Sequence, residues 1–288
     1  MDNQELEKRL NELEQMYLDA EKSITKIINS SDTFTPSEKA SILAKIKSQL
    51  SDLSGQVRKE AGSDIRSTYK GGKHDAVELL KDAGENINYS FNKTDFEAIR
   101  AIQDETFAMM GDAISGVNRS VNKILADATA QRVKAKFIEG RLSGGTLKQI
   151  SDSVAGAIKD GFVSLVDKGG KTWELGNYSK MLVRTKMIES ANTGMMNQLS
   201  AYGFDIVQCS QHNGACQLCT PWEGKLLSIS GRSVGKVKGV DNSVDDAKAG
   251  GLFHPNCRHR LVPYHPRFSE LSDQWAAEKY KLPAGETA

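Results

Sequence analysis

The chain has 288 residues, of which 39% are hydrophobic and 26% are charged, and its formal net charge is +1. This length allows one large or two ordinary domains with a sizeable core. The balanced charge excludes a global field that would draw the protein to nucleic acid or a membrane, so such a contact would need a local patch. No apolar run approaches the roughly 20 residues of a membrane helix, and the acidic N-terminus lacks a signal-peptide core. We therefore expect synthesis in a cytosol, where cysteines stay reduced, and no membrane partner.

Two apolar stripes with helical spacing occupy the first part of the chain. The first consists of Leu6, Leu10, Leu13, Tyr17, Ala20, Ile24 and Ile27. The second consists of Ile42, Ile46, Leu50, Leu53 and Val57. Between them, Thr35 and Glu38 form a capping box with proline at the first helical position. The pattern predicts an antiparallel helical hairpin over 1–72. It would be either an arm for docking or self-association through 3–60, or two helices of a bundle.

The middle of the chain, residues 73–160, again has a helical pattern. A break is expected before it, because glycines are frequent from Gly62 to Gly72. Thr94 and Glu97 predict a capping box for one of the middle helices. We expect this region to be helical throughout.

The pattern changes at residue 161. Residues 162–175 predict a β-hairpin, residues 178–202 a long helix capped by Asn177, and residues 204–209 a strand. Residues 161–265 are expected to form a small α+β domain, followed by a polar tail over 266–288. The expected fold class is therefore α+β and mainly α.

All four cysteines and four of the five histidines lie between residues 209 and 265. Cys216 and Cys219 form a Cys-x2-Cys pair, and His254 and Cys257 form a His-x2-Cys pair. Two tight pairs from distant loops are the usual source of four tetrahedral zinc ligands. The spacing predicts a structural zinc ion that staples the loop between the pairs, which has few apolar anchors.

Other interpretations of these residues remain open. His212 and His259 are alternative ligands or outer partners of the ligands. A site with only three protein ligands could activate water, with Glu223 or Asp205 as the local candidates for a general base. A thiol nucleophile would need a lowered pKa and an orienting partner. Without a metal, the cysteines would be reduced and the histidines would bond to the backbone.

The loop between the two pairs is locally basic. No acidic residue occurs over 224–239, and two arginines flank the second pair. The basic residues are Lys225, Arg232, Lys236, Lys238, Arg258 and Arg260. Such a loop could contact a DNA backbone, or its charges could simply be solvated. No aromatic residue interleaves it, so stacking on bases is not expected.

Several motifs resemble the signature of the phage minor capsid protein 2 family. They are Asp167–Trp173, Tyr178, Met181–Thr185, Gly203–Val207, Ser210–His212, Cys219–Lys225, Gly251–Phe253 and Asn256–His259. The resemblance covers about 161–265, extends to the helices from residue 94 and does not include 1–70. That family is similar to the wider MuF-like group of phage head morphogenesis proteins, in which a Cys-x2-Cys and a later His-Pro-Asn-Cys-Arg recur.

The resemblance implies a non-enzymatic structural protein of a tailed-phage head. It would be made in the host bacterial cytoplasm and built into the virion near the portal, with portal, capsid and scaffold proteins as partners. Packaged DNA is a further implied partner, and some relatives are thought to leave the head with it. The positions that carry over are Arg184, Thr185, His212, Cys219, Gly224, Lys225, Asn256, Cys257 and His259.

The chain also departs from the family pattern. Relatives often lack the counterparts of Cys216 and His254, and Glu223 replaces a more usual Gln or Asp, so the identity of the four ligands stays open. Two functions from other classes remain as alternatives. One is a treble-clef-like metal-dependent nuclease, since such enzymes also combine Cys-x2-Cys with later His and Cys residues. The other is a helical adaptor without a phage role, for which the heptads alone argue.

Overall fold

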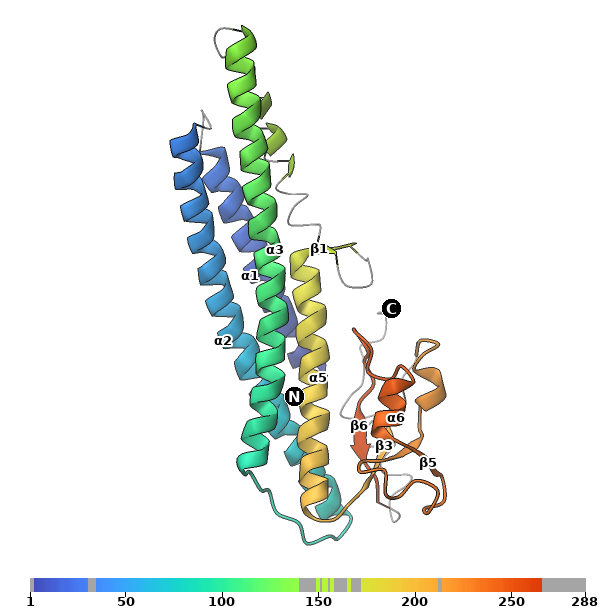
Figure 1. The fold of residues 1–288 in the computed structure, drawn as a ribbon. Helices are drawn as coiled ribbons and strands as arrows, with labels where there is room; N and C mark the ends of the chain where they lie inside the picture. The colour runs from blue at the N-terminus through green and yellow to red at the C-terminus, as the bar shows by residue number, and fades with distance from the viewer. Residues whose placement is uncertain are drawn as a thin grey trace. The chain divides into compact units, whose positions relative to one another are not determined.

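A computed structural model describes residues 3–30, 35–139, 149–150, 152–154, 156–157, 165–166, 172–211 and 214–265. The chain divides into two compact units. Unit 1 comprises Met1–Leu10, Ala61–Thr106 and Met181–Ala288, and unit 2 comprises Asn11–Glu60 and Phe107–Lys180. The expected fold class is confirmed, because long helices dominate and a small mixed sheet lies in the C-terminal part (Figure 1). The four regions expected from the sequence stay a prediction.

Four long helices supply most of the chain, and each contributes residues to both units. They are α1 (Asn3–Asn29), α2 (Pro36–Asp82), α3 (Lys93–Glu139) and α5 (Leu175–Ala201). In unit 2, α1 and α2 form the expected hairpin, and Ser23 Oγ donates a hydrogen bond to Gln49 Oε1 at 3.1 Å. The predicted stripes are buried, except that Ile28 takes the place of Ile27. These stripes are thus covered within the chain, which favours the bundle interpretation over self-association through them.

The start of α2 is capped as the sequence predicts, whereas the start of α3 is not. Thr35 and Glu38 exchange both bonds of a capping box, at 2.9 and 3.2 Å. At α3 the cap is Asn92, whose Oδ1 accepts from the Thr94 N–H at 2.9 Å. Asp95 completes the box by accepting from the Asn92 N–H at 2.8 Å. The predicted box from Thr94 is wrong, because the helix begins earlier and Asn is at least as good a cap as Thr.

This cap can be tested directly. Asn92→Ala is expected to lower the free energy of unfolding by about 1 kcal/mol, since the first turn of α3 loses its side-chain acceptor. Thr94→Ala, two residues further along, should change it by less than about 0.5 kcal/mol. Urea unfolding of both variants measures the difference. Equal losses would restore the box from Thr94.

The break expected between Gly62 and Gly72 is also wrong, because α2 is continuous through this segment. Gly72 instead lies against the backbone of α5 in unit 1. A methyl group placed on it would overlap the carbonyl group of Ala191, and one on Gly194 would overlap that of Tyr69. These two glycines therefore allow α2 and α5 to touch backbone to backbone. Close helix packing outweighs the modest helix propensity cost of glycine here.

The elements after residue 160 largely follow the prediction. β1 (Leu165–Val166) and β2 (Thr172–Trp173) pair antiparallel, which confirms the hairpin. The helix predicted over 178–202 is α5, which starts three residues earlier than expected. The rest of the hairpin segment and the polar tail over 266–288 lie outside the described residues.

The C-terminal part of unit 1 is a four-stranded mixed sheet with the order β5-β4-β3-β6. β3 pairs antiparallel with β4 and β6, and β5 pairs parallel with β4. The elements are β3 (Ile206–Cys209), β4 (Leu226–Ser228), β5 (Val240–Ser243), α6 (Val244–Ala249) and β6 (Leu261–Pro263). The predicted strand over 204–209 is β3. The sequence did not predict β5 and α6, which give the loop between the Cys/His pairs apolar anchors of its own.

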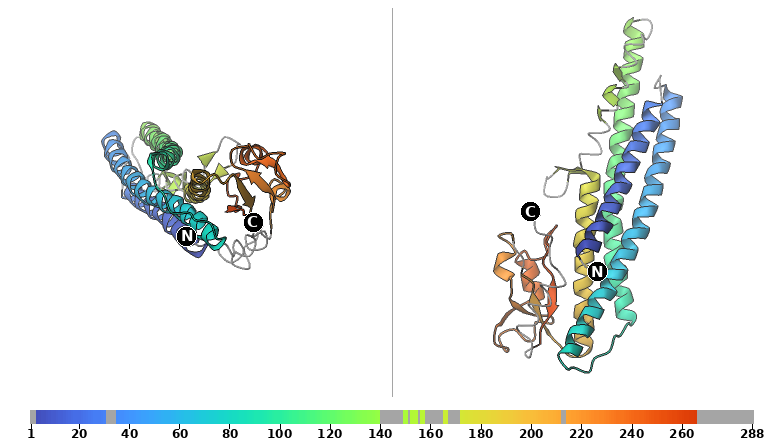
Figure 2. Two further views of the ribbon diagram at one scale, coloured as in Figure 1. Left: turned by 90° about the horizontal axis from the view of Figure 1, so that it is seen from below. Right: turned by 180° about the vertical axis from the view of Figure 1, so that it is seen from behind.

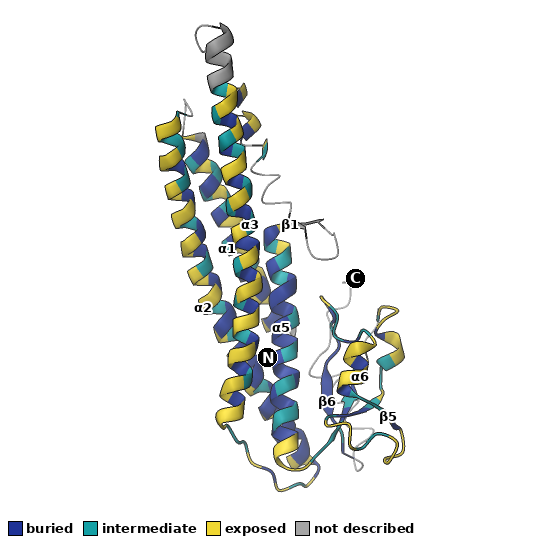
Figure 3. Ribbon diagram, in the orientation of Figure 1, coloured by how far each residue is buried: buried dark blue, intermediate teal, exposed yellow. Residues whose placement is uncertain are grey.

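The sheet packs beside the C-terminal part of α5, as the views in Figures 1 and 2 agree. The backbone N–H of Leu261 in β6 donates to Asn192 Oδ1 on α5 at 3.0 Å. Between Met181 and Leu199, α5 is buried around most of its surface (Figure 3). The core under the sheet includes Leu199, Val207 and Leu227, together with Cys219 and Cys257. No helix in the described part of the chain is long and apolar enough to cross a membrane.

Candidate metal centre

The Cys-x2-Cys pair lies on a tight turn that leads into the short 3-10 helix η1 (Thr220–Trp222). The Cys219 N–H donates to the carbonyl of Cys216 at 3.0 Å, which closes the turn. Desolvation raises the pKa of Cys216, but hydrogen bonds from Cys219, Leu218 and His254 together outweigh it and lower the pKa to about 7. Backbone N–H groups that point at a sulfur favour its thiolate, which is the form that binds a metal.

The His-x2-Cys pair lies on a second turn, between α6 and β6. The Cys257 N–H donates to the carbonyl of His254 at 2.9 Å. Phe253 and Asn256 have positive φ angles of 63° and 67°. Non-glycine residues rarely adopt this left-handed conformation, so the turn depends on outside contacts to hold it.

The two turns face each other, and each cysteine of the first pair contacts one residue of the second pair. Cys216 Sγ lies 3.1 Å from His254 Nε2, and Cys219 Sγ lies 3.6 Å from Cys257 Sγ. The structure therefore brings all four predicted ligands into one cluster. Cys219 and Cys257 are buried, whereas Cys216 is exposed.

His259 also joins this cluster. Its Nδ1 lies 3.6 Å from Cys257 Sγ, and its Nε2 lies 3.1 Å from Glu223 Oε1. Among the described residues, ligand atoms within 4.8 Å of one another form two triplets that share Cys219. One triplet is Cys216, Cys219 and His254, and the other is Cys219, Cys257 and His259. The four predicted ligands are thus divided between the two triplets. His212, the second alternative ligand, lies outside the described residues.

The donors fit zinc in type, and the two shortest contacts approach zinc spacing, but the ligand atoms of the predicted quartet do not all lie within 4.8 Å of one another. With Zn–S bonds of about 2.3 Å and Zn–N bonds of about 2.1 Å, ligand atoms of a tetrahedral site lie roughly 3.6–3.8 Å apart. The contacts of 3.1 and 3.6 Å are close to this spacing. Each histidine also has an outer partner, which is the carbonyl of Pro255 for His254 at 2.8 Å and the Glu223 carboxylate for His259. Such partners orient the imidazole of metal-binding histidines.

The burial of the thiols determines the charge that they carry with and without a bound cation. Desolvation and the neighbouring Cys257 raise the pKa of Cys219 far above the usual range of a thiol. A bound metal ion would compensate the charge of the thiolates and reverse this shift. The cluster can therefore hold a divalent metal whose removal leaves neutral thiols in the core.

Two other residues between 209 and 265 do not join the cluster. Cys209 lies buried in β3, where desolvation raises its pKa to about 12, and its Sγ contacts the carbonyl of Ser210 at 3.6 Å. His265 Nε2 lies 3.0 Å from Glu85 Oε1, next to the C-terminal end of α2. Neither residue belongs to a ligand triplet, although Cys209 lies near enough to Cys257 and Glu223 for them to contribute to its raised pKa.

Asp205, a candidate base, serves instead as the anchor of the loop after β4. Its carboxylate accepts from Ser228 Oγ and Ser233 Oγ at 2.6 Å each and from the Ser230 N–H at 2.8 Å. These bonds outweigh desolvation and lower the pKa of Asp205 well below its usual range. Local sequence patterns could not indicate this arrangement, because the serines follow Asp205 by more than twenty residues.

The anchor predicts a pH-dependent stability. Asp205→Asn is expected to reduce the free energy of unfolding at pH 7 by about 2 kcal/mol, because charge-assisted hydrogen bonds are lost. A lowered folded-state pKa means that the stabilisation is complete above the unfolded pKa of about 3.9 and declines at lower pH. The gap between wild type and variant should therefore narrow below about pH 4. Thermal unfolding from pH 3 to 7 measures it, and the exposed Asp241→Asn is the control. A gap of the same size at every pH would contradict the assignment.

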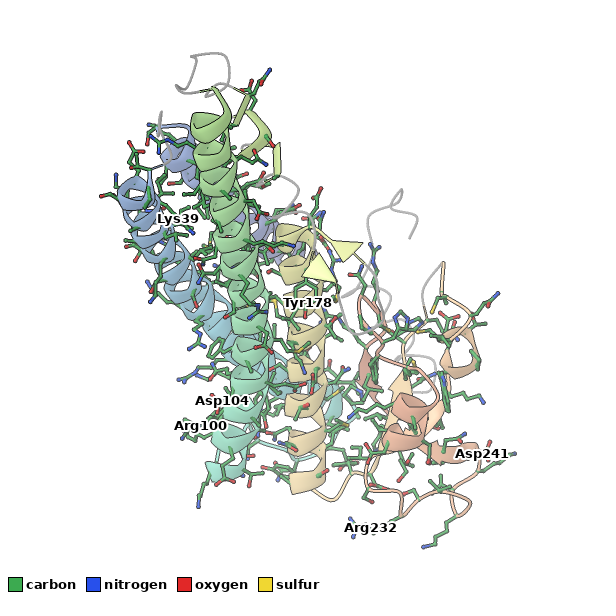
Figure 4. All side chains as sticks on the ribbon, turned by 45° about the horizontal axis from the view of Figure 1, so that its top comes forward. Lys39, Arg100, Asp104, Tyr178, Arg232 and Asp241 are labelled. Carbon is green, nitrogen blue, oxygen red and sulfur yellow. The ribbon has the colours of Figure 1, made fainter. Side chains whose placement is uncertain are left out.

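Most of the predicted basic contacts lie on the surface. Lys225, Arg232, Lys236 and Lys238 are exposed, and Arg258 is partly buried. Figure 4 shows Arg232 and Asp241 on the outer side of the C-terminal part, with the Arg232 side chain directed outward. Arg260 is only 7% exposed, so the structure removes it from a DNA-contacting surface.

The comparisons with known proteins place the chain in a family. The family model described as "Phage minor capsid protein 2" matches residues 2–284. The chain belongs to the phage minor capsid protein 2 family. The match confirms the resemblance and extends it over the N-terminal helices, for which the sequence motifs gave no indication.

A curated relative in a phage agrees with this family. It is named "Structural protein" of Lactococcus phage LL-H, and it is 22% identical to this minor capsid family member over 210 residues. The match covers 65% of this chain and 57% of the relative, so the chain spans little more than half the length of that protein. No solved structure shows a significant match.

Proposed function

We propose that this chain is a structural component of the head of a tailed phage, made in the host cytoplasm and built into the particle near the portal. The observation that carries this proposal is the family match over 2–284. The relative named as a structural protein supports it. The helical adaptor without a phage role loses its basis with the family assignment. The portal, capsid or scaffold proteins are the partners we expect.

We further propose that one zinc ion holds the two turns together, with Cys216, Cys219, His254 and Cys257 as ligands. Both short contacts, at 3.1 and 3.6 Å, join one turn to the other, so one ion between them would cross-link the turns. His259, oriented by Glu223, is the alternative fourth ligand. The role of the ion is structural, since it would close a loop of more than thirty residues and stabilise the folded state.

The test of the head proposal is the composition of particles. Phage carrying a tagged copy of this gene should yield purified heads that contain the protein at a low, constant ratio to the major capsid protein. Heads assembled with a Cys219→Ser copy should contain less of it, whereas a Cys209→Ser copy should enter normally. If the protein is absent from purified heads, and its deletion leaves full infectious particles, the proposal is wrong.

We also propose that the basic loop contacts packaged DNA through its phosphates. Arg232, Lys236 and Lys238 are exposed in the loop after β4, which Asp205 anchors, and the exposed Lys225 directly precedes β4. Replacing Arg232, Lys236 and Lys238 with serine should weaken binding to duplex DNA. The slope of log K against log salt concentration should also become smaller in magnitude by about 3. A matched control replaces three exposed lysines of α2, Lys45, Lys47 and Lys59. Equal effects of the two triple variants would contradict a specific role of the loop.

The same DNA assay separates the nuclease alternative. A structural protein leaves supercoiled plasmid intact in the presence of Mg²⁺. Nicking by wild type that disappears in His259→Ala would instead indicate a metal-dependent nuclease, with the His259–Glu223 pair at its centre.

A further inference from the structure

The turn that carries Cys257 is held from outside by two consecutive residues of α5. Arg184 Nη1 donates to Asn256 Oδ1 at 2.9 Å, and Thr185 Oγ1 accepts from the Asn256 N–H at 3.2 Å. The side chain and the backbone of Asn256 are thus both fixed. Asn256 has a φ angle of 67°, a left-handed conformation that L-residues other than glycine rarely adopt without such contacts.

Thr185 is itself fixed in one orientation. Its hydroxyl donates to the carbonyl of Met181 at 2.8 Å, so the oxygen lone pairs are directed to the Asn256 N–H. Because Asn256 directly precedes Cys257, the position of this amide determines where Cys257 Sγ lies relative to Cys219. Thr185 therefore acts on the metal cluster through the backbone, without touching a ligand sulfur.

Arg184 connects the same turn to the first turns of α1. Its Nη2 donates to both carboxylate oxygens of Glu7 at 2.7 Å each. The Arg184 side chain is 10% exposed and that of Glu7 is 28% exposed, so the pair is largely removed from water. Close, charge-assisted pairs of this kind are strong and directional. Asn256, Arg184 and Glu7 form a continuous chain of hydrogen bonds within unit 1.

We propose that Arg184 and Thr185 are positioning residues for the metal centre, and that Glu7 couples metal binding to the docking of residues 3–10. The inference rests on the proposed zinc ion. Arg184 and Thr185, with their bonds to Asn256, form a clamp on the turn. Zinc needs Cys257 in the position that this clamp fixes, so the ion and the clamp favour the same state. By thermodynamic linkage, zinc then strengthens the docking of α1, and the docked α1 strengthens zinc binding by the same factor.

The first experiment measures zinc affinity by competition with a chromophoric chelator in the full chain. Thr185→Val keeps the shape of the side chain and removes its hydroxyl, and it should weaken zinc binding by roughly 10-fold or more, as for other outer partners of metal ligands. Arg184→Met should weaken it at least as much. Glu7→Gln should give a smaller, several-fold loss, because it acts only through Arg184.

The matched control is Lys180→Met. Lys180 also joins α5 to α1, through Glu14 at 3.1 Å and Asn11 at 2.6 Å in unit 2, but within the described part of the chain it does not hydrogen-bond to the turn of Asn256. Its loss should leave zinc affinity unchanged. Circular dichroism of each variant checks that it folds, and the nearly isosteric Thr185→Val keeps the test valid if Arg184→Met does not fold.

The second experiment measures hydrogen exchange of residues 3–10 with and without zinc. Zinc should slow exchange there in wild type and in Lys180→Met, and this effect should disappear in Glu7→Gln. If wild type, Thr185→Val and Arg184→Met bind zinc with equal affinity, the positioning role of Arg184 and Thr185 is wrong, but the metal site itself is not contradicted. If zinc does not change the hydrogen-exchange rate of residues 3–10, the proposed coupling is wrong. A wild type that binds no zinc would overturn the metal site and the inference together.

Discussion

Gly194→Ala is expected to lower the free energy of unfolding by about 3 kcal/mol. A side chain at this position would meet the backbone of α2 at Tyr69, and backbone cannot move aside as a flexible side chain can. The two helices would have to separate, which opens the packed interface. The hydrogen bond from Tyr69 to Asp95 would be weakened as well. The effect should appear as a lower midpoint in urea with an unchanged slope.

The chain offers controls of the same type for this substitution. Gly55 in α2 and Gly111 in α3 are also helical glycines, and a Cβ on either meets no atom within 4 Å. Gly55→Ala and Gly111→Ala should stabilise the protein by about 0.5–1 kcal/mol each, since alanine is the better helix former. If Gly194→Ala gave the same gain as Gly55→Ala, the close approach of α2 and α5 would be wrong.

Lys73→Met is expected to cost about 3–5 kcal/mol, because it leaves the carboxylate of Asp95 buried without its cation. Lys73 Nζ lies 2.6 Å from Asp95 Oδ1, and both side chains are 1% exposed. Tyr69 also donates to this carboxylate at 2.8 Å. Although burial raises the pKa of Asp95, the bonds from Lys73, the Asn92 backbone and Tyr69 lower it overall. The carboxylate therefore stays charged and needs its partner.

A double variant and a surface pair complete this test. Lys73→Met with Asp95→Asn removes both charges, so it should recover a large part of the loss. Arg100 and Asp104 form an exposed pair one turn apart on α3 (Figure 4), and Arg100→Met should cost less than about 0.5 kcal/mol. Equal losses from Lys73→Met and Arg100→Met in urea unfolding would show that the buried pair contributes no more than a surface pair.

The sequence predicted those parts of the fold that depend on local patterns. The stripes of α1 and α2, the box at Thr35 and the strand β3 all follow from spacing or capping within a few residues. The errors at Gly62–Gly72 and at Thr94 have another origin. Gly72 contacts a helix more than a hundred residues away, and that contact decides its role, so local propensity pointed to a break that does not exist.

The candidate site shows the same division. The two short-spaced pairs were identifiable, because ligands of a tight turn are separated by two residues. Glu223 and Thr185 were also singled out, as a candidate base and as a position of the family, but their supporting roles were not predicted, since both reach the cluster only through the fold. Likewise, nothing in the local sequence around Arg260 indicated that it is buried, because its burial comes from packing in unit 1.

The metal content of the purified full chain, measured by plasma mass spectrometry, decides whether the two turns form one structural zinc site. We expect about one zinc per chain in wild type and in Cys209→Ser, and almost none in Cys219→Ser or Cys257→Ser. Comparing His254→Ala with His259→Ala identifies the fourth ligand, and we expect the loss in His254→Ala. If wild type contains no zinc, or if Cys219→Ser still contains one zinc per chain, the two turns do not form this site.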